Sequence, residues 1–472
     1  MAACEAVITC VAFSELGLWS VLLGAAFGVA SFVLLRKSAT EQPRRNARYL
    51  ASSCMAIVYS VSIVIGSQLD NSSEIIWSFF TVLRILSIGL IAFGAMSFLM
   101  LKLDQCSDGG LFERHRVVVK GRTKAAVFIA VMIPQVLVYL VVFPGVYGYD
   151  AGFHLLQFFD EQTSLTSAYS VPYTLFLGSC INFGQIYFNN AESGFALAML
   201  LQSVFLCAVS SYAAIVSYRE TGSRVILVLS VLFFAVFPPF LIMRVSSAQD
   251  ALFGGFFLLL VVQLFECSKL LKSGLHKKDM PLVIGLAVSA LCLFLLRNNG
   301  IYAFAVMLVL AIPVLAHFKR LGLGVVLLVP VALYCLISGP VYSLMGVQPG
   351  AAVGISSARE MLSVPSQQIA RVSLANPDAL SPEEWQLLDK YYLDESFDYY
   401  WVNPSISDLQ KAEIDSNEIT KDPLGYIRLY CSLGIKDPGN YIEAFLMNSL
   451  GFWYPGKQYP DPRMYHLSLI HI

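Results

Sequence analysis

Long apolar runs recur along the chain and constrain its fold more than any other feature. About 20 helical residues span a bilayer core about 30 Å thick, whereas a barrel strand needs only about ten. The runs have helical length, and 13% of the 472 residues are charged, against about 25% in soluble domains. The candidate spans are residues 8–35, 50–66, 75–101, 124–143, 193–217, 224–242, 250–266, 281–296, 300–317 and 321–338. We therefore expect an all-α, polytopic membrane protein with about 10 spanning helices.

Basic residues are concentrated in five connecting loops, which indicates the topology. These loops cover residues 36–48, 102–124, 217–224, 268–278 and 317–320. The positive-inside rule places all five in the cytoplasm. The ten crossings agree with this rule only if the less apolar stretch 171–187 does not cross. We predict that this stretch is a re-entrant or interfacial segment on the outer side, and that the chain beyond about residue 339 is also outside.

Composition divides the chain into three predicted regions. Residues 1–123 hold the N-terminal helices and cytoplasmic loops, and residues 124–345 form the core transmembrane domain with an outer loop at 144–192. Residues 346–472 are acidic, with nine Lys or Arg against sixteen Asp or Glu. Within this last region, Ser381 and Glu384 form a capping-box pattern that starts a helix. We expect a mostly helical, extracytoplasmic C-terminal region.

Several functional classes lack support in the sequence. The net charge of −1 provides no global basic field for nucleic acid. The ten Cys include no CxxC pair and no Cys/His cluster, which argues against a disulfide framework or a zinc site. The GxSxG, Walker A and HExxH motifs are also absent, so nucleotide hydrolysis and metalloprotease chemistry have no support.

The stretch FPGVYGYDAGFHLLQF (143–158) places Asp150 and His154 directly after a spanning segment. A carboxylate in a partly apolar pocket can act as a general base toward a hydroxyl group. Asp150 also has glycines on both sides, at Gly148 and Gly152, and Asp is common in turns and helix caps. The residues alone leave both interpretations open.

A single charged residue, Arg297, stands between two long apolar segments and is followed by Asn298 and Asn299. An arginine at this depth is costly unless it is paired or faces an aqueous cavity, and its planar guanidinium suits phosphate. The alternative is an arginine at a helix end that extends to the membrane surface.

Two further stretches hold candidate binding residues. In RVSSAQD (244–250) we favour Asp250 as the cap of the following helix. In PSQQIAR (365–371), Gln367, Gln368 and Arg371 share one helical turn. Ligand contact and the polar face of a surface helix explain this turn equally well.

Seven short stretches, taken in order, carry a resemblance to a known family. They are FPGVYGYD (143–150), a helix start containing Gln157, SVPYTLFL (170–177), SSAQDALF (246–253), RNNGIYA (297–303), PSQQIAR (365–371) and GFWYP (451–455). Across residues 120 to 455 the chain resembles an uncharacterised bacterial family, domain of unknown function 6020. It is also similar in layout to the multi-pass C-type glycosyltransferases, which use lipid-phosphate sugar donors.

The resemblance implies roles for individual residues. Asp150 would activate the acceptor, Arg297 would hold the donor phosphate, and an outer domain would cover the site. The chain departs from the pattern at three positions. It has Val171 before Pro172 where members often have His, Gln249 before Asp250 where they often have Lys, and Ala151 in place of a second acid.

Relatives also continue beyond the end of this chain, which finishes with LSLIHI after GFWYPGKQYPDPRMYH. We therefore expect a truncated C-terminus. The bacterial resemblance and the topology together predict a multi-pass protein of the bacterial plasma membrane, with its C-terminal region extracytoplasmic.

The leading hypothesis is a glycosyltransferase that moves a sugar, with inversion, from a polyprenyl-phosphate donor to an extracytoplasmic glycan or cell-envelope acceptor. Tyr147, Tyr149 and Phe153 would stack on sugar rings. One alternative is a lipid-linked glycan transporter or flippase, which predicts polar residues deep in the spans, where Gln202 and Gln263 are the few we find. The other is a non-catalytic envelope assembly subunit.

The predicted catalytic residue is Asp150. The predicted substrate-binding residues are His154, Gln157, Asp250, Arg297, Asn298, Asn299, Gln367, Gln368 and Arg371. No cofactor or metal ligand is assigned, although a divalent metal between Asp150 and Asp250 stays open. The expected partners are membrane lipid, the lipid-phosphate sugar and a glycan or lipid acceptor, without nucleic acid.

Overall fold

The structure is a computed structural model that describes residues 45–108, 117–148, 150–319, 321–349, 359, 361–393, 397, 400–401 and 404–456. For residues 45–48, 102–108, 272–273, 299, 321–323, 325 and 409 it describes the backbone alone. The predicted span 8–35 and Tyr149 lie outside the described residues. The described residues form helices, joined by turns and three isolated bridges.

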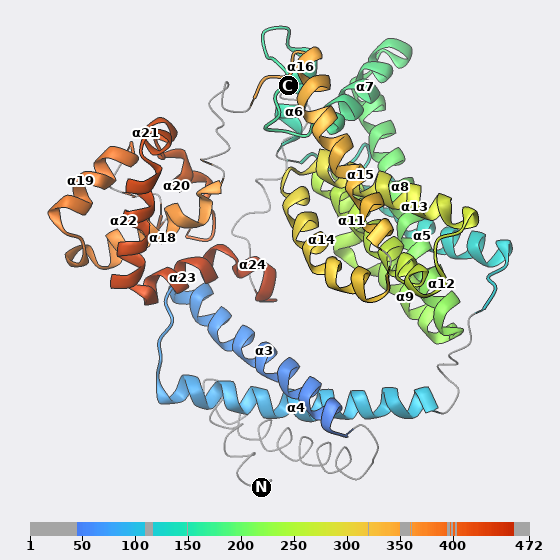
Figure 1. Ribbon diagram of the computed structural model, residues 1–472, viewed down its shortest axis with the longest axis horizontal. Coiled ribbons are helices and arrows are strands. Elements are labelled where there is room, and N and C mark those ends of the chain that lie inside the picture. The colour runs from blue at the N-terminus through green and yellow to red at the C-terminus, as the bar shows by residue number, and fades with distance from the viewer. Residues whose placement is uncertain are drawn as a thin grey trace. The chain divides into compact units, whose positions relative to one another are not determined.

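The contacts divide the chain into two compact units, each coloured along the chain in Figure 1. The first, here called the N/C unit, contains described residues 45–108 and 359–456. The second, here called the central unit, contains described residues 117–349. The central unit is close to the predicted core region 124–345. The packing of the N-terminal helices with the C-terminal region was not part of the prediction.

The central unit contains all helices from α5 to α16. They are α5 (Gly121–Val141), α6 (Ala151–Phe159), α7 (Val171–Phe188), α8 (Ala191–Thr221), α9 (Arg224–Val236), α10 (Pro238–Arg244), α11 (Gln249–Ser268), α12 (Leu270–Ser273), a 3-10 turn (Lys277–Asp279), α13 (Met280–Leu296), α14 (Asn299–His317), α15 (Leu321–Leu336), a π-helical turn (Ile337–Val341) and α16 (Tyr342–Leu344).

The N/C unit joins two long helices to a group of shorter ones. They are α3 (Arg45–Ser72), α4 (Phe79–Asp108), α18 (Ser363–Ala375), a 3-10 turn (Pro377–Ala379), α19 (Pro382–Tyr391), α20 (Asp408–Ala412), α21 (Ser416–Lys421), α22 (Pro423–Lys436), α23 (Pro438–Asn448) and α24 (Leu450–Trp453).

Eight described helices are long and apolar enough to cross a membrane, and α9 with α10 forms a ninth crossing if the bent pair is one span. These nine segments coincide with the nine predicted spans that lie within the described residues. Their outer surfaces carry large apolar side chains, such as Leu137 on α5 and Leu310 on α14. The prediction of an all-α, polytopic membrane protein is confirmed.

The span formed by α9 and α10 is bent by 54° at two consecutive prolines, Pro238 and Pro239. Proline has no N–H, so the carbonyl of Phe234 loses the helical partner that residue 238 would supply. Nη1 of the buried Arg244 donates to this carbonyl at 3.0 Å, and Nη2 donates to the Ser210 hydroxyl at 2.8 Å. Arg244 therefore stabilises the bend, because its guanidinium satisfies a carbonyl that the proline leaves without a helical partner.

Helix α7 covers the stretch predicted not to cross, and it is not among the candidate spans. It is a continuous helix of 18 residues, which fits an interfacial or outward position better than a re-entrant loop. A two-residue turn connects it to α8, whose 31 residues extend about 46 Å at 1.5 Å per residue. Gly184 and Gly194 allow the two backbones to touch, since a Cβ on Gly184 would lie 2.3 Å from the Gly194 nitrogen.

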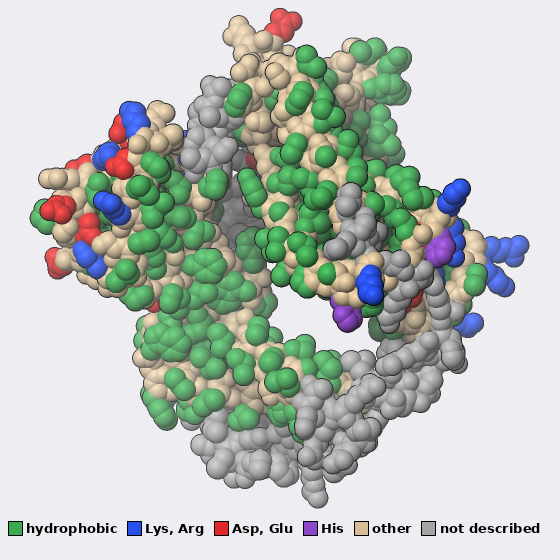
Figure 2. Space-filling model, viewed as in Figure 1, with side chains coloured by type: hydrophobic (Ala, Val, Ile, Leu, Met, Phe, Trp, Pro, Cys, Tyr) green, Lys and Arg blue, Asp and Glu red, His purple; other side chains and the backbone are tan. Residues whose placement is uncertain are grey.

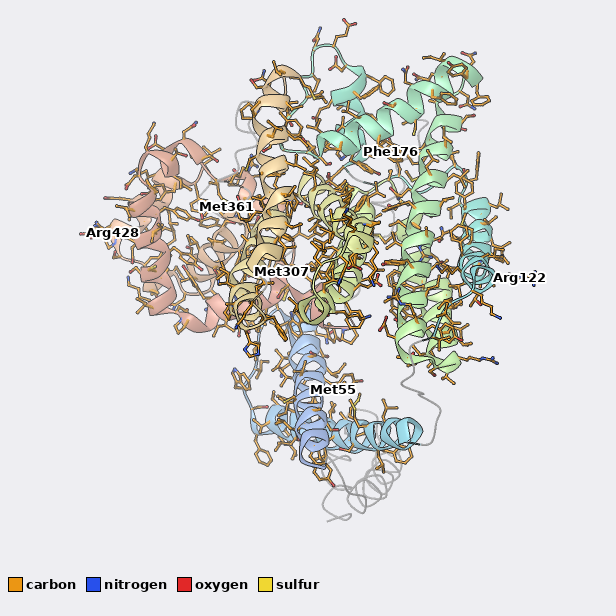
Figure 3. All side chains as sticks on the ribbon, turned by 45° about the vertical axis from the view of Figure 1, so that its right-hand side comes forward. Met55, Arg122, Phe176, Met307, Met361 and Arg428 are labelled. Atoms are coloured by element: carbon orange, nitrogen blue, oxygen red, sulfur yellow. The ribbon has the colours of Figure 1, made fainter. Side chains whose placement is uncertain are left out.

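The two ends of the central unit differ in charge. At one end, Arg219 forms ion pairs with Glu220 and Glu266, and Lys269 pairs with Glu220 at 2.5 Å. Figure 2 shows the basic side chains gathered at this end, and Arg122 at the start of α5 points away from the bundle in Figure 3. The helices α6 and α16 lie at the other end, at the top of Figure 1.

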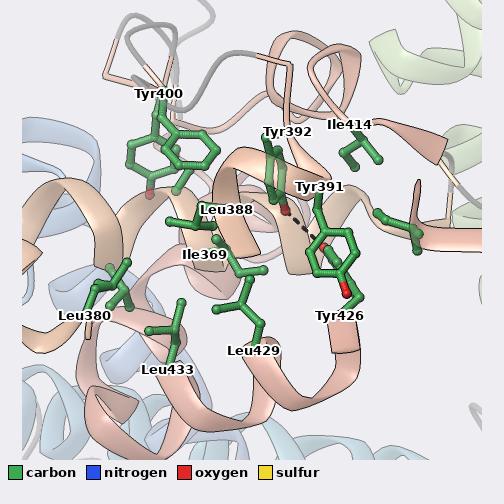
Figure 4. Close-up of a cluster of buried hydrophobic side chains, with 14 of the residues drawn as sticks. Ile369, Leu380, Leu388, Tyr391, Tyr392, Tyr400, Ile414, Tyr426, Leu429 and Leu433 are labelled. Atoms are coloured by element: carbon green, nitrogen blue, oxygen red, sulfur yellow. Dashed lines mark hydrogen bonds between the residues drawn. The ribbon is translucent and has the colours of Figure 1, made fainter. Parts of the chain in front are cut away.

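The C-terminal helices have a core of their own, rich in tyrosine (Figure 4). The side chains of Ile369, Tyr391 and Leu433 are fully buried there. Ser381 caps α19, and the Glu384 carboxylate accepts a hydrogen bond of 2.7 Å from the Ser381 N–H, so the predicted capping box is confirmed. This region is helical, as expected.

Candidate functional site

Two loops far apart in sequence lie side by side in the central unit. The Val146 N–H donates to the Val245 carbonyl at 2.8 Å, and the Ser247 N–H donates back to Val146 at 2.9 Å. A Cβ on Gly148 would lie 2.9 Å from the Ser247 carbonyl oxygen, so only glycine allows this approach. The pairing brings the start of α6 close to the start of α11.

Arg297 and Asp250 form a two-point ion pair at this junction. The Arg297 Nε and Nη2 atoms each lie 2.6 Å from one oxygen of the Asp250 carboxylate. These hydrogen bonds raise the pKa of Arg297, and the charge of nearby Asp150 raises it further. Both side chains of the pair are about two-fifths exposed, at 41% and 43%. The junction therefore gathers two carboxylates and one guanidinium from three separate parts of the chain.

Asp250 is the second residue of α11 and does not cap it. The residue preceding the helix is Ala248, and no side chain caps this end. The favoured interpretation of Asp250 as a cap is therefore wrong, because the carboxylate is drawn to Arg297. Asp150 occupies the N-cap position of α6, yet its side chain makes no capping hydrogen bond there.

Asn298 and Asn299 follow Arg297 at the start of α14. The exposed Asn298 amide donates to the Ser167 carbonyl at 3.3 Å and accepts from the Tyr334 hydroxyl at 3.3 Å. The side chain of Asn299 lies outside the described residues. Asn298 thus connects the loop before α7 to α15, beside the ion pair.

The beginning of α7 is fixed next to Arg297 by Ser170 and Gln249. The Ser170 hydroxyl donates to the Leu295 carbonyl at 2.9 Å, and the Ser170 N–H donates to the Gln249 side chain at 3.2 Å. Gln249 is one of the three positions at which the resemblance indicates a departure from the family pattern. Here its amide has a structural contact, which sequence reasoning did not predict.

His154 and Gln157, predicted to bind substrate, lie in the protein interior. His154 is fully buried, and its Nδ1 shares a hydrogen bond of 2.7 Å with the Thr174 hydroxyl. Burial lowers the pKa of His154 to about 4, so its imidazole is neutral at pH 7. The Gln157 amide oxygen accepts from the Thr166 N–H at 2.9 Å. The first contact attaches α6 to α7, and the second attaches α6 to the loop before α7.

Three buried polar atoms around this site have no hydrogen-bond partner among the described residues: the Tyr147 and Tyr173 hydroxyls and His154 Nε2. The ring centroids of His154 and Tyr173 are 5.1 Å apart, and those of Tyr147 and Phe195 are 5.3 Å apart. Burial raises the pKa of Tyr173, and the charge of Asp250 adds to this effect. The sequence analysis did not name Tyr173 as a candidate site residue. The N-cap Ser170 and Pro172 mark the start of helix α7, and Tyr173 lies in its first turn.

Gln367, Gln368 and Arg371 lie in the N/C unit, on α18. The Gln367 amide oxygen accepts from Asn448 at 3.0 Å, and the Gln368 amide donates to the Tyr441 carbonyl at 2.9 Å. All three side chains are buried within their own unit. These contacts favour a role of the three side chains in holding the fold together. That they bind a ligand stays a prediction.

No group of three or more His, Cys, Asp or Glu side chains in the described part of the chain is arranged to hold a metal ion. Asp250 is ion-paired with Arg297, and the charge of Asp150 also acts on this guanidinium, so a positive charge already lies close to both carboxylates.

The fold defines a multi-pass helical membrane protein with a polar, ion-paired site where several spans end. The chain belongs to the family of unknown function DUF6020, whose sequence profile matches residues 153–469. The matched range includes Asp250, Arg297 and α18, and it begins three residues after Asp150. No curated protein and no solved structure matches the chain.

Proposed function

We propose that the protein transfers a sugar from a polyprenyl-phosphate donor to an extracytoplasmic glycan or cell-envelope acceptor. The observation that carries this proposal is the convergence of Asp150, Asp250 and Arg297 at the end of the spans. A guanidinium next to the bilayer suits the phosphate of a lipid-linked donor. A second carboxylate within its electrostatic reach supplies a candidate base.

The distribution of charge supports a site on the extracytoplasmic side of the membrane. In the central unit, the ion pairs and basic loops around Arg219 and Lys269 lie at one end of the spans, and the Asp150 junction lies at the other. The positive-inside rule assigns the basic end to the cytoplasm. The Asp150 junction then faces outward, where lipid-linked sugars meet envelope acceptors.

The same rule supports an outer position for the C-terminal region. In the N/C unit, Nη2 of Arg371 donates to the Ser73 carbonyl at 2.8 Å, in the turn between α3 and α4. This turn is at the opposite ends of both helices from the basic loops 36–48 and 102–124. The C-terminal helices therefore share the outer side with the α3–α4 turn.

The proposed reaction assigns a step to each charged side chain. Asp250 engages Nε and Nη2 of Arg297 and fixes the guanidinium plane, which leaves the Nη1 edge to meet the donor phosphate. Asp150 takes the proton of the acceptor hydroxyl. The acceptor oxygen forms a bond to the anomeric carbon as the bond from that carbon to the phosphate oxygen breaks. Polyprenyl phosphate leaves with the bonding electrons, and the anomeric configuration inverts.

The first test compares wild-type protein with Asp150→Asn in nanodiscs that contain a panel of polyprenyl-phosphate sugars, with mass spectrometry of the products. Asp160→Asn is the matched control, because this exposed carboxylate follows the same short helix and, within the part of the chain that the structure describes, accepts hydrogen bonds from Gln162 and Thr163 of its own turn. The proposal expects turnover in the wild type and in the control, and none in Asp150→Asn, which still binds donor.

Arg297→Ala and Arg297→Lys test the phosphate contact separately. Lysine keeps the positive charge but cannot form the two-point contact with Asp250 that orients the side chain toward the phosphate. Donor binding should therefore weaken in both variants, and more in Arg297→Ala. Donor binding that is unchanged in Arg297→Ala would show that the phosphate is held elsewhere. Binding without turnover in wild type and Asp150→Asn alike would favour a flippase or an assembly subunit.

A further inference from the structure

Helices α23 and α24 are apolar on two faces. The first face is buried against the rest of the N/C unit and includes Ala444, Met447 and Leu450. The second face is exposed, with Phe445 at 50% and Phe452 at 94%. A surface helix in contact with water normally has a polar outer face. This exposed face therefore needs an apolar occupant.

The buried face seats α23 and α24 on the end of the α3 span. Met447 and Leu450 form a small core with Ile65 and Leu69 of α3. The ring of Tyr454 covers Gly66 so closely that a Cβ there would lie 2.4 Å from it. Because α3 is a candidate span, this contact fixes α23 and α24 at the depth where the span ends.

The neighbouring α3–α4 turn carries large exposed aromatic side chains. Trp77, Phe79 and Phe80 are 70%, 76% and 61% exposed, and they stand at the start of the α4 span. Trp and other aromatic residues concentrate where membrane meets water. Glu443 of α23 accepts a hydrogen bond of 3.0 Å from the Ile75 N–H in the same turn, so α23 lies at this aromatic level.

Apolar and charged side chains lie on different parts of the N/C unit. Figure 2 shows apolar side chains covering α3, α4 and the adjoining C-terminal helix, whereas charged side chains gather on the part farthest from the spans. That part includes the ion pairs Lys390–Asp422 and Lys421–Glu418. One side of the C-terminal region is thus suited to water and the other to lipid.

We propose that α23 and α24 lie in the membrane–water interface, with Ile442, Phe445 and Phe452 in contact with lipid, and that they anchor the C-terminal region to the bilayer. The occupant of the exposed face is lipid because this face adjoins α3, a candidate span whose exposed side chains, such as Val58, are also apolar. The anchor holds the C-terminal helices at a fixed depth, whatever reaction the central unit performs.

The test measures lipid contact at single labelled positions of the full-length protein in nanodiscs. Phe452→Cys, in a chain whose ten native Cys are replaced, carries an environment-sensitive fluorophore, and the nanodiscs contain phosphatidylcholine spin-labelled near the headgroup. Val58→Cys, exposed on α3 within the span, is the lipid reference. Asn417→Cys, exposed on α21, is the aqueous reference.

We expect the label at 452 to emit at shorter wavelength than the label at 417 and to lose most of its emission to the spin-labelled lipid, as the label at 58 does. Phe445→Cys repeats the measurement from α23, so that misfolding of one variant does not decide the result. Lipid quenching at 452 and 445 no greater than at 417 overturns the proposal. Protection of both positions from lipid quenchers and from aqueous iodide also overturns it, since protein would then cover the face.

Discussion

Arg371 provides the sharpest test of whether the polar turn in PSQQIAR builds the fold or contacts a ligand. Its side chain is 1% exposed, and its guanidinium donates to the Asn440 amide at 2.9 Å, the Tyr400 hydroxyl at 3.3 Å and the Ser73 carbonyl at 2.8 Å. It also forms an ion pair with Glu443. All these acceptors belong to the N/C unit, so Arg371 ties α18 to α23 and to the α3–α4 turn.

Replacement by methionine keeps a long side chain but removes the charge and every donor. Glu443 is then left without its cation in a largely buried position, 17% exposed. Breaking a buried ion pair by removing one partner costs about 3–5 kcal/mol. At about 2–4 °C per kcal/mol for a domain of this size, the unfolding midpoint of the N/C unit should fall by on the order of 10 °C.

Tryptophan fluorescence during thermal unfolding in detergent measures this change, because Trp77, Trp385, Trp401 and Trp453 all lie in the N/C unit. Adding Glu443→Gln to Arg371→Met removes the uncompensated charge and should recover part of the loss, as a double-mutant cycle would show. An Arg371→Met protein that melts within about 1 °C of wild type while losing donor binding would refute this reasoning and restore the ligand-contact interpretation.

Three further predictions concern packing, pH and an unpaired hydroxyl. Gly66→Ala places a methyl group against the Tyr454 ring and should lower the stability of the N/C unit by about 1–3 kcal/mol, whereas Gly254→Ala, with nothing within 4 Å, should be neutral or raise stability by up to about 1 kcal/mol. Urea titrations of both variants measure the contrast. Burial alone would raise the pKa of Glu384, but hydrogen bonds, first from the Lys436 side chain, lower it to about 2. Because the unfolded pKa is higher, near 4.5, this carboxylate contributes stability above pH 4.5 that is lost as the pH falls toward 2, about 3 kcal/mol in all. Unfolding of Glu384→Gln across this range should show a flatter pH dependence, and an unchanged slope would contradict the assignment. Tyr173→Phe removes a buried hydroxyl that has no partner among the described residues and should leave stability unchanged or raise it by about 1 kcal/mol. A clear loss of stability on calorimetry would show that this hydroxyl has a partner in the working protein.

The sequence by itself determined the membrane-spanning helices, because span length and apolarity are properties of each segment taken alone. The nine predicted spans within the described residues coincide with helices, and the stretch 171–187 stays outside the set of candidate spans. The capping box of Ser381 and Glu384 was predictable for the same reason, since its partners are three residues apart.

Only the tertiary structure decided the pairing of charges. Asp250 has a local explanation as a helix cap, and Arg297 has one as a helix-end residue, so the sequence gives no reason to join them across 47 positions. Their ion pair forms because α11 and α13 pack with opposite directions and place both residues at the same end.

The sequence also did not predict that the N-terminal helices α3 and α4 pack with the C-terminal helices. Arg371 meets Ser73 across 298 positions, and Met447 and Leu450 complete the end of α3. An apolar helix face specifies that it must be covered but not which partner covers it, because many faces of similar shape satisfy the same hydrophobic requirement. The sequence therefore fixes which segments enter the membrane, and tertiary packing fixes which polar groups meet at their ends.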